Sequence, residues 1–429
     1  MKNAQLIVLI FALSLFACEK ENYQQSSTDQ QAALGMHHND KIIASAKYTG
    51  VEDPEKAVAG QYVVQLSPAY LKPGAEMESK SDGNRVDNGK AAEARAAEGK
   101  IKIDALLREL GIGQEQILYY YTEALAGFAA RLSDDEVRRL LEDTRIISIE
   151  QDHLFQFDET PEEITDTPKS QVVPCGITRH GWGNGSNSSK WIWIVDSGIQ
   201  LNHPDLNVVT NTLYARSFTG GTPNDCQGHG THVAGTAAAK NNTIGVRGVS
   251  AGAPVVPVKV FNGCTNSGSL TSILAGINHV AMYDEAGDVC NLSLGGYYGN
   301  GCSTYSSYRT AVFNLANGGT WAVIAAGNDG AFAGNYQPAC INGTRIVTVA
   351  NMTCSGTFYY TSNWGVPPVD WIATGTQVYS TYLNSGYSTM TGTSMAAPHV
   401  SGIIHQRQGS PVQCGTVSYY GSSYKVACR

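Results

Sequence analysis

Apolar and polar positions alternate differently in the first and second parts of this chain. In the first part, short apolar strands and amphipathic or alanine-rich helical stretches follow one another over residues 59–66, 91–110, 117–121, 128–132, 133–141 and 146–149. The polar stretch 72–90 is expected to be a loop, and Ser133 with Glu136 forms a capping box that opens the second helix. The order βαββαβ predicts a small ferredoxin-like α+β domain, and no cluster of His, Cys or carboxylate residues suggests chemistry in it.

The second part contains fully apolar runs, which are typical of strands buried on both faces of a sheet. These runs lie at 191–195, 255–261, 289–294, 321–326 and 346–350. Helices are expected to begin near His229, Ser269, Tyr305 and Ser394. The alternation predicts an α/β domain whose parallel sheet is covered by helices on both faces. In such sheets ligands bind beyond the carboxyl ends of the strands, so polar residues at these ends are candidates for function.

Composition divides the chain at the same place and excludes some partners. Most charged residues lie before residue 160, whereas the later part is rich in Gly, Ser, Asn and Tyr. The acidic stretch 158–168 carries two prolines and no periodicity, which indicates an exposed linker that a protease could cut. A formal net charge of −8 and the lack of a basic block argue against a nucleic-acid partner. We expect domains at 46–157 and 173–429, joined by a cleavable linker at 158–172.

The N-terminus has the pattern of an export signal. An apolar run at 6–17 follows Met1-Lys2-Asn3, and it is too short for a bilayer span, which needs ~20 residues. The run ends in Leu-Phe-Ala-Cys18, which resembles a bacterial lipoprotein signal with Cys18 as the lipidated residue; an ordinary signal cut nearby is the alternative. We therefore expect a signal at 1–17, a polar tether at 18–45, and export to the outside or to the cell envelope as a lipoprotein.

Four segments at strand or helix ends carry the candidate chemistry. Asp196 ends an apolar strand, and Asn328 follows another; alone, each is more simply a turn residue or helix cap. His229 and His232 open a helix, but a zinc site would need further ligands that the sequence does not supply. Ser394 begins an Ala-rich helix, where serine is usually an N-cap, and it lacks the Gly-x-Ser-x-Gly elbow.

Taken together, the ordered motifs around Asp196, His229, Asn328 and Ser394 resemble the subtilisin family of serine endopeptidases, especially its proteinase K and aqualysin branch. The resemblance covers 174–402 and implies that Ser394 is the nucleophile and His229 its base, oriented by Asp196. Such a base is needed because a serine hydroxyl is a weak nucleophile at neutral pH. The Asn328 amide and the Ser394 N–H would stabilise the oxyanion.

The same resemblance implies where substrate binds. An extended peptide would become a strand between two segments of the cleft, beside a pocket for the residue before the cut bond. The implied binding residues are Asn266, Ser267 and Gly268 on one side, Ser293, Leu294 and Gly295 on the other, and Ala325, Ala326 and Gly327 at the pocket. No charged residue can be assigned to the pocket floor, so we expect broad specificity with a preference for large apolar or aromatic residues.

The first domain resembles the inhibitory propeptide of this family, including its segments at 127–132 and 149–153. We therefore expect autocleavage between Gln156 and Val173, with the chain's own propeptide and protein or peptide substrates as partners of a monomer. One alternative is a catalytically silent binding protein that keeps the scaffold. Another, a cysteine- or metal-dependent hydrolase, lacks its motif.

Ten cysteines leave an odd number once Cys18 is assigned to the signal. The resemblance implies a Cys226–Cys264 bridge, and Cys414 with Cys428 would staple a tail that is short for the family and replaces its terminal helix. Cys290, in an apolar strand, is expected to be the free thiol, whereas Cys302, Cys340 and Cys354 remain unassigned; Cys175 stands where the family often has Trp.

No cofactor is expected for catalysis, but calcium is common in the family. Asp370 aligns with a ligand carboxylate of the proteinase K branch, with backbone carbonyls near Gln337 and Ala339 as partners. A solvated strand-end Asp is the alternative.

Overall fold

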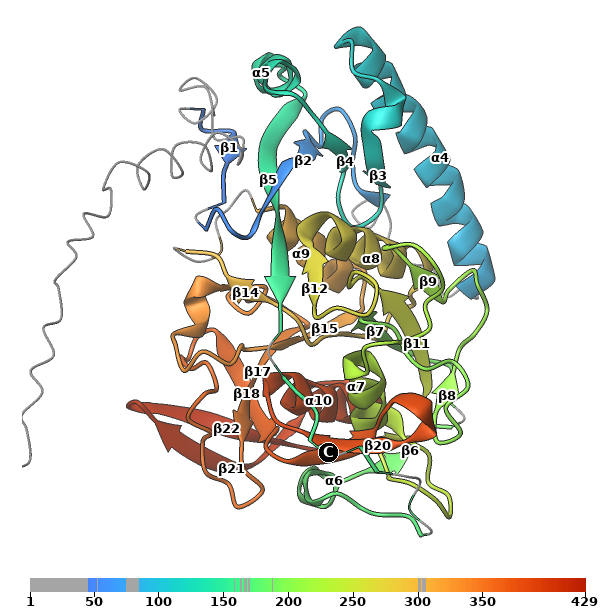
Figure 1. Ribbon diagram of the computed structural model, residues 1–429, viewed down its shortest axis with the longest axis vertical. Coiled ribbons are helices and arrows are strands. Elements are labelled where there is room, and N and C mark those ends of the chain that lie inside the picture. The colour runs from blue at the N-terminus through green and yellow to red at the C-terminus, as the bar shows by residue number, and fades with distance from the viewer. Residues whose placement is uncertain are drawn as a thin grey trace, which may run out of the picture.

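The computed structural model describes residues 45–51, 53–74, 85–157, 159–162, 164, 165, 168, 170–186, 188–299, 302 and 306–429. The expected signal, the tether apart from its last residue and Cys18 lie outside the described residues. The N-terminal domain sits on one side of the larger α/β domain, and a single strand reaches from the first into the second (Figure 1). No helix in the described part of the chain is long and apolar enough to cross a membrane.

The N-terminal domain has the predicted βαββαβ order. Its main elements are β2 (Ala57–Leu66), α4 (Arg85–Glu109), β3 (Ile117–Tyr121), β4 (Gly127–Arg131), α5 (Asp134–Glu142) and β5 (Ile146–Gln156). The sheet order is β1-β5-β2-β4-β3, with β1 at Tyr48–Thr49. Buried Val64, Phe128 and Ile149 from the strands pack with Ile103 and Leu106 of α4 to form one small core.

Two boundaries of this domain differ from the sequence prediction. The prediction of a loop at 72–90 was wrong for its last six residues, because α4 begins at Arg85. Arg85 and Gly89 are buried, and the Gly89 backbone lies so close to the Tyr283 ring that a Cβ would be 2.9 Å from it. β5 is also longer than expected, since residues after Ile149 leave the small core and enter the other domain. Contacts between domains therefore stabilise both polar segments.

The α/β domain has the predicted fold class, a mainly parallel sheet with helices on both faces. The sheet order is β21-β22-β18-β17-β15-β13-β7-β11-β8. Its long parallel strands are β7 (Ile192–Asp196), β11 (Pro254–Lys259), β13 (Val289–Leu292), β15 (Trp321–Ala325), β17 (Ile346–Met352) and β18 (Val369–Thr374). The helices that cover them are α7 (His229–Ala238), α8 (Leu270–Tyr283), α9 (Ser307–Asn317) and α10 (Thr393–Arg407), and α6 (Cys175–His180) precedes the sheet.

Alternation along β7 shows how both faces are covered. Ile192 and Ile194 pack in a cluster with α7, whereas Trp193 and Val195 pack in a cluster with α8 and α9. Successive side chains of a strand point to opposite faces, so a fully apolar strand requires helices on each side. The remaining strands are short: β6 (Gly183–Asn184), β8 (Asn207–Val208), β9 (Arg216–Ser217), β10 (Ser250–Ala251), β12 (Ser267–Ser269), β14 (Gly296–Tyr297), β16 (Tyr336–Gln337), β19 (Val378–Thr381) and β20 (Tyr387–Met390).

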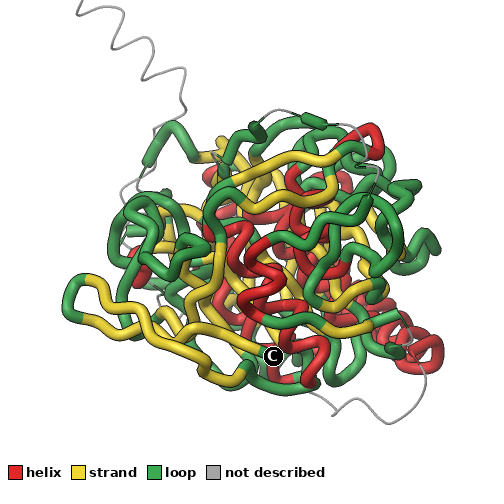
Figure 2. Tube along the Cα trace, turned by 90° about the horizontal axis from the view of Figure 1, so that it is seen from below, coloured by secondary structure: helices red, strands yellow, loops and turns green. Residues whose placement is uncertain are grey.

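The tail forms a hairpin at the edge of the sheet. β21 (Val412–Tyr419) and β22 (Ser422–Cys428) pair antiparallel, and β22 joins β18 at Ile372 and Val426. The view from below shows the hairpin projecting beyond the helices at the centre (Figure 2). From the sequence we expected a hairpin carrying Cys414 and Cys428, and these two strands form it.

Candidate active site

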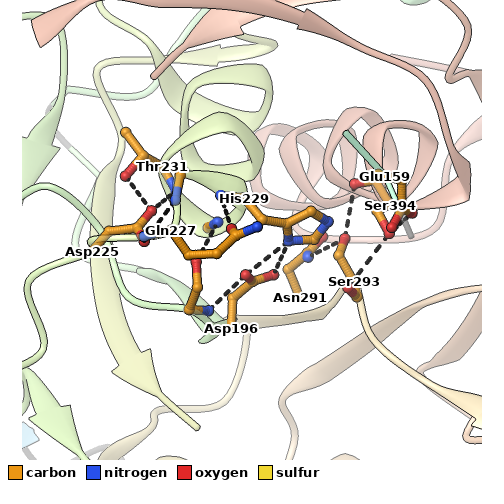
Figure 3. Close-up of polar contacts among 12 residues, drawn as sticks. Glu159, Asp196, Asp225, Gln227, His229, Thr231, Asn291, Ser293 and Ser394 are labelled. Atoms are coloured by element: carbon orange, nitrogen blue, oxygen red, sulfur yellow. Dashed lines mark hydrogen bonds and ion pairs between the residues drawn. The ribbon is translucent and has the colours of Figure 1, made fainter. Parts of the chain in front are cut away.

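An aspartate and a histidine form a buried pair at the carboxyl end of the sheet. Asp196 is the last residue of β7, and His229 is the first residue of α7; neither is exposed to solvent. The ring Nδ1 of His229 lies 2.8 and 3.0 Å from the two carboxylate oxygens of Asp196 (Figure 3). Burial lowers the pKa of His229, but the nearby carboxylates of Asp196 and Glu159 outweigh it and raise the pKa above its ordinary value. The pair can therefore stabilise an imidazolium.

The sequence around His229 explains why α7 begins there. The buried Asp225 carboxylate accepts hydrogen bonds from the backbone N–H of Gly228 and Thr231, which caps the helix. Gly230 permits close packing, since a Cβ at this position would lie 2.1 Å from the Gly198 carbonyl oxygen. These contacts fix His229 against the end of β7.

His232, the second histidine of α7, has a structural role: its ring contacts backbone carbonyls. Its Nε2 lies 2.9 Å from the Val378 carbonyl and 3.1 Å from the Ser388 carbonyl, and burial lowers its pKa to about 3. Within the described ranges, no group of three or more His, Cys, Asp or Glu side chains could hold a metal ion.

A serine and an asparagine face the pair from the other side of the cleft. Ser394 is the second residue of α10, so its backbone N–H lies in the first helical turn. Asn328 follows β15, and its Oδ1 accepts from Thr393 N at 2.8 Å and from Thr393 Oγ1 at 3.1 Å. These bonds assign the Asn328 Nδ2 the role of a donor toward the cleft.

A residue that the sequence did not single out lies between these groups. Glu159 is only 8% exposed, and its Oε1 accepts from Ser394 Oγ at 2.5 Å and from Asn328 Nδ2 at 2.7 Å. His229 Nε2 is buried, and within the described part of the chain it has no hydrogen-bond partner. The structure thus brings the four expected residues together, but the Ser394 hydroxyl bonds Glu159 and not His229.

The segment before Glu159 occupies one side of the cleft as a strand. β5 pairs antiparallel with β12, with Phe155 opposite Gly268 and Gln156 opposite Ser267. Phe157 N donates to the Asn266 carbonyl at 3.1 Å, and Asn266 Nδ2 donates to the Phe157 carbonyl at 2.8 Å. The expected binding residues on this side therefore contact the N-terminal domain through its backbone.

Two aromatic side chains of this segment fill the cleft. The Phe157 ring stacks on the His229 ring at 4.1 Å between centroids. The Phe155 ring packs edge-on against Tyr308, and Gly296 lies beside it. Phe155 and Phe157 are two residues apart, so their side chains lie on the same face of the extended segment, the face that packs into the cleft.

The other expected binding residues surround a cavity next to Ser394. This cavity has a volume of about 180 Å³, and its lining includes Leu294, Gly295, Ala325, Ala326, Gly327 and Asn328. Ser293 lies behind it, with its Oγ donating to the Ser394 carbonyl at 2.9 Å. Three charged residues that the sequence did not assign to the cavity also border it: Asp329, whose side chain is exposed, and Lys56 and Glu159 of the N-terminal part of the chain.

After Glu159 the linker runs past Ser394 and continues along β20. Glu162 N donates to the Thr389 carbonyl at 2.9 Å, and Thr165 exchanges backbone hydrogen bonds with Tyr387. The uncut chain therefore contacts the α/β domain on both sides of Ser394.

Asp370, the residue predicted to bind calcium, is half-buried on β18. Its Oδ2 accepts from Thr348 N at 2.9 Å, and Thr348 Oγ1 donates to the Ala339 carbonyl at 2.9 Å. The carboxylate and one of the two expected carbonyls thus flank one residue. Burial raises the pKa of Asp370 to about 6.

A polar cluster joins separate segments of the chain near Asp205. Gln171 Nε2 lies 2.8 Å from the Lys240 carbonyl and 3.3 Å from both Asn242 Oδ1 and the Val246 carbonyl. The Asp205 carboxylate accepts from Asn242 Nδ2 and Val246 N. These hydrogen bonds tie the three segments together.

The cysteines form four disulfides in the described residues. Both pairs expected from the sequence are bonded, and the bonded pairs are Cys226–Cys264, Cys414–Cys428, Cys175–Cys354 and Cys302–Cys340. Cys290 is a buried free thiol, as its apolar strand led us to expect.

A buried carboxylate–imidazole pair facing a serine at a helix start, with a side-chain amide beside it, is the arrangement of serine hydrolases. A model of the subtilase family matches residues 189–408, and a model of the peptidase inhibitor I9 matches residues 61–158. The chain belongs to the subtilase family of serine proteases, and its N-terminal domain is an inhibitor I9 propeptide domain.

Two relatives identified by sequence agree with this assignment, and a solved structure is similar to part of this chain. The "Extracellular serine proteinase" of Thermus sp. (strain Rt41A) is 32% identical over 415 residues, covering 94% of this chain and 89% of the relative. "Thermitase" of Thermoactinomyces vulgaris is 38% identical over 225 residues, covering 52% of this chain and 76% of the relative. A solved "cold adapted subtilisin-like serine proteinase" is 33% identical, with a TM-score of 0.46 over 53% of this chain and 77% of that one.

Proposed function

We propose that the protein is an exported endopeptidase, made as a self-processed zymogen, whose chemistry is carried by Asp196, His229, Ser394 and Asn328. One observation carries the proposal. A single oxygen, Oε1 of Glu159, accepts hydrogen bonds from both the Ser394 hydroxyl and the Asn328 amide. An oxygen so placed marks where the nucleophile and an oxyanion donor converge.

The roles follow from the positions of these groups. Ser394 Oγ attacks the peptide carbonyl while His229 Nε2 takes its proton, and Asp196 stabilises the imidazolium that forms. The negative charge that develops on the carbonyl oxygen is held by Asn328 Nδ2 and the Ser394 N–H. His229 then protonates the leaving amine, and a water molecule hydrolyses the acyl-serine ester to release the second product.

Phenylmethylsulfonyl fluoride tests this function directly. It should inactivate the processed enzyme and add its mass at Ser394, whereas a catalytically silent binding protein would have no activity to lose. Activity that resists the reagent without a Ser394 adduct would contradict the proposal.

The cleft supports broad specificity with a preference for large apolar residues before the cut bond. Backbone pairing with β12 is independent of side-chain type, and the cavity beside Ala325 and Gly327 is lined mainly by small and apolar residues. A peptide-library profile with a tenfold or greater preference for Lys or Arg at this position would contradict the proposal.

Self-cleavage is proposed between Gln156 and Val173, in the linker that passes Ser394. The Ser394→Ala chain should stay full length during purification, while the wild-type chain is cut. Maturation of Ser394→Ala without added protease would show that another enzyme processes the chain.

Structural calcium is proposed at Asp370 with carbonyls near Gln337 and Ala339. Chelation by EDTA should then lower the melting temperature, and an unchanged melting temperature would exclude this site. For the uncut precursor we propose either attachment through a lipid on Cys18 or, with an ordinary signal cut nearby, release from the cell. The processed enzyme is proposed to be a monomer.

A further inference from the structure

The carboxylate of Glu159 lies in the position that a peptide carbonyl must occupy for reaction. It accepts from Ser394 Oγ at 2.5 Å and from Asn328 Nδ2 at 2.7 Å, and it belongs to the same chain. Figure 3 shows Glu159 beside Ser394, with His229 on the opposite side. A carboxylate carries negative charge on its oxygens, as the tetrahedral intermediate does, so Asn328 Nδ2, one of the two donors proposed for the oxyanion, also holds Glu159.

The shape of the site admits this side chain closely. A Cβ at position 392 would lie 2.6 Å from Glu159 Oε1, so any other residue in place of Gly392 would force the carboxylate to shift from this position. On the N-terminal side, Phe157 is anchored by two hydrogen bonds to Asn266 and stacks on His229. These contacts fix the chain two residues before Glu159.

The hydrogen bond to Glu159 also keeps the Ser394 hydroxyl from bonding to its base, His229. The Ser394 hydroxyl donates its proton to Glu159, and within the described chain His229 Nε2 is left buried without a hydrogen-bond partner. A carbonyl cannot enter the oxyanion position, and Ser394 cannot pass its proton to His229, until Glu159 leaves.

We propose that Glu159 is a built-in blocker of the oxyanion site, a side-chain carboxylate that binds the uncut precursor in a non-productive position and slows its self-cleavage. The proposal rests on the proposed function, because it assumes that Ser394 and Asn328 perform the reaction. The site would then also bind, in a non-productive position, peptides that carry an acidic side chain two residues after an anchored aromatic residue.

The first test compares self-cleavage of three full-length chains. Glu159→Gln keeps the size of the side chain but removes its charge, and Glu162→Gln is the matched control because that side chain is exposed. Since charge-assisted hydrogen bonds are about twice as strong as neutral ones, Glu159→Gln should lose its full-length form at least about fivefold faster than wild type. The control should stay within about twofold of wild type. Equal or slower cleavage of Glu159→Gln would overturn the proposal.

A second test does not depend on folding of the variant. The processed wild-type enzyme is given two synthetic peptides with the sequence of residues 154–165, carrying Glu or Gln at the position of Glu159. Non-productive binding lowers kcat and KM by the same factor and leaves kcat/KM unchanged, so the Glu peptide should show both values reduced. A loss of kcat/KM at constant KM would mean that Glu is merely a poor substrate residue, and it would overturn the proposal.

Failure of the proposed function would look different. The wild-type and Glu159→Gln chains would both stay full length, and the enzyme would cut neither peptide. That result would remove the basis of both proposals, whereas cleavage of both peptides with equal kcat would overturn only the role of Glu159.

Discussion

Replacing Arg85 by alanine should loosen the N-terminal domain from the catalytic domain. Arg85, the first residue of α4, donates to both carboxylate oxygens of Asp288, at 2.7 and 3.1 Å, and to the Tyr283 carbonyl at 2.9 Å. Its guanidinium carbon lies 3.7 Å from the centre of the Trp191 ring. The side chains of Arg85 and Asp288 are 8% and 0% exposed, so solvent does little to weaken the pair.

The loss of binding free energy depends on the hydrogen bonds that Asp288 keeps when Arg85 is removed. Breaking a buried ion pair typically costs roughly 3–5 kcal/mol because one charge is left without a partner. Asp288 retains three donors, the backbone N–H groups of Trp191 and Glu285 and the indole N–H of Trp193, so the lower end of this range applies. A loss of about 3 kcal/mol corresponds to a roughly 150-fold weaker complex after the linker is cut.

Dilution of the cut complex measures this change. The fraction of active enzyme is read with a fluorogenic peptide over a range of concentrations, which gives the dissociation constant of the inhibitor domain. Arg138→Ala is the matched control, because Arg138 pairs with Asp135 on the exposed surface of α5 and such pairs contribute about 0–1 kcal/mol. A dissociation constant of Arg85→Ala less than about fivefold above wild type would refute the reasoning.

Three further outcomes are expected. Asn328→Ala should lower kcat by roughly 10²–10³ with little change in KM, the loss typical of subtilisin-type oxyanion amides, and a kcat near wild type would remove its role. Replacing Cys226 and Cys264 by alanine opens a link across 38 residues, and urea unfolding should show a loss of about 3–4 kcal/mol; a smaller loss would mean that the bond is strained. Self-cleavage should slow as pH falls through the pKa of His229, because only the neutral ring accepts a proton. Since the Glu159 charge helps raise that pKa against the effect of burial, Glu159→Gln should shift the acid limb of the pH–rate profile to lower pH, and an unshifted limb would contradict this.

The fold was predictable where local pattern and tertiary packing agree. The apolar runs predicted five of the six long parallel strands of the α/β domain to within a few residues, because each is buried on both faces. The sixth, β18, was missed because Asp370 interrupts its apolar run. Prediction failed at Arg85 and beyond Ile149, where polar residues are ordered by the other domain. Glu150 and Asp152 belong to this segment, and they accept hydrogen bonds from the N-terminal backbone N–H groups of α9 and α8. A carboxylate that caps a distant helix has no local signature.

The site was predictable from four motifs but not as a whole. Asp196, His229, Asn328 and Ser394 each end a strand or open a helix, and the topology brings such positions to one edge of the sheet. Glu159 lies among several acidic residues of the linker, and nothing in its neighbours distinguishes it. Its position depends on the pairing of β5 with β12, a long-range register that sequence alone does not specify.

The short strand β12 bears on how the enzyme behaves once its inhibitor has left. Departure of β5 removes the strand that pairs with Ser267–Ser269, and an open strand edge invites association between molecules. This edge is only three residues long and runs directly into α8, so it offers too few bonds to join two folded enzymes. A locally unfolded polypeptide can still lie along it, so we expect flexible loops and denatured chains to be cut in preference to intact sheets.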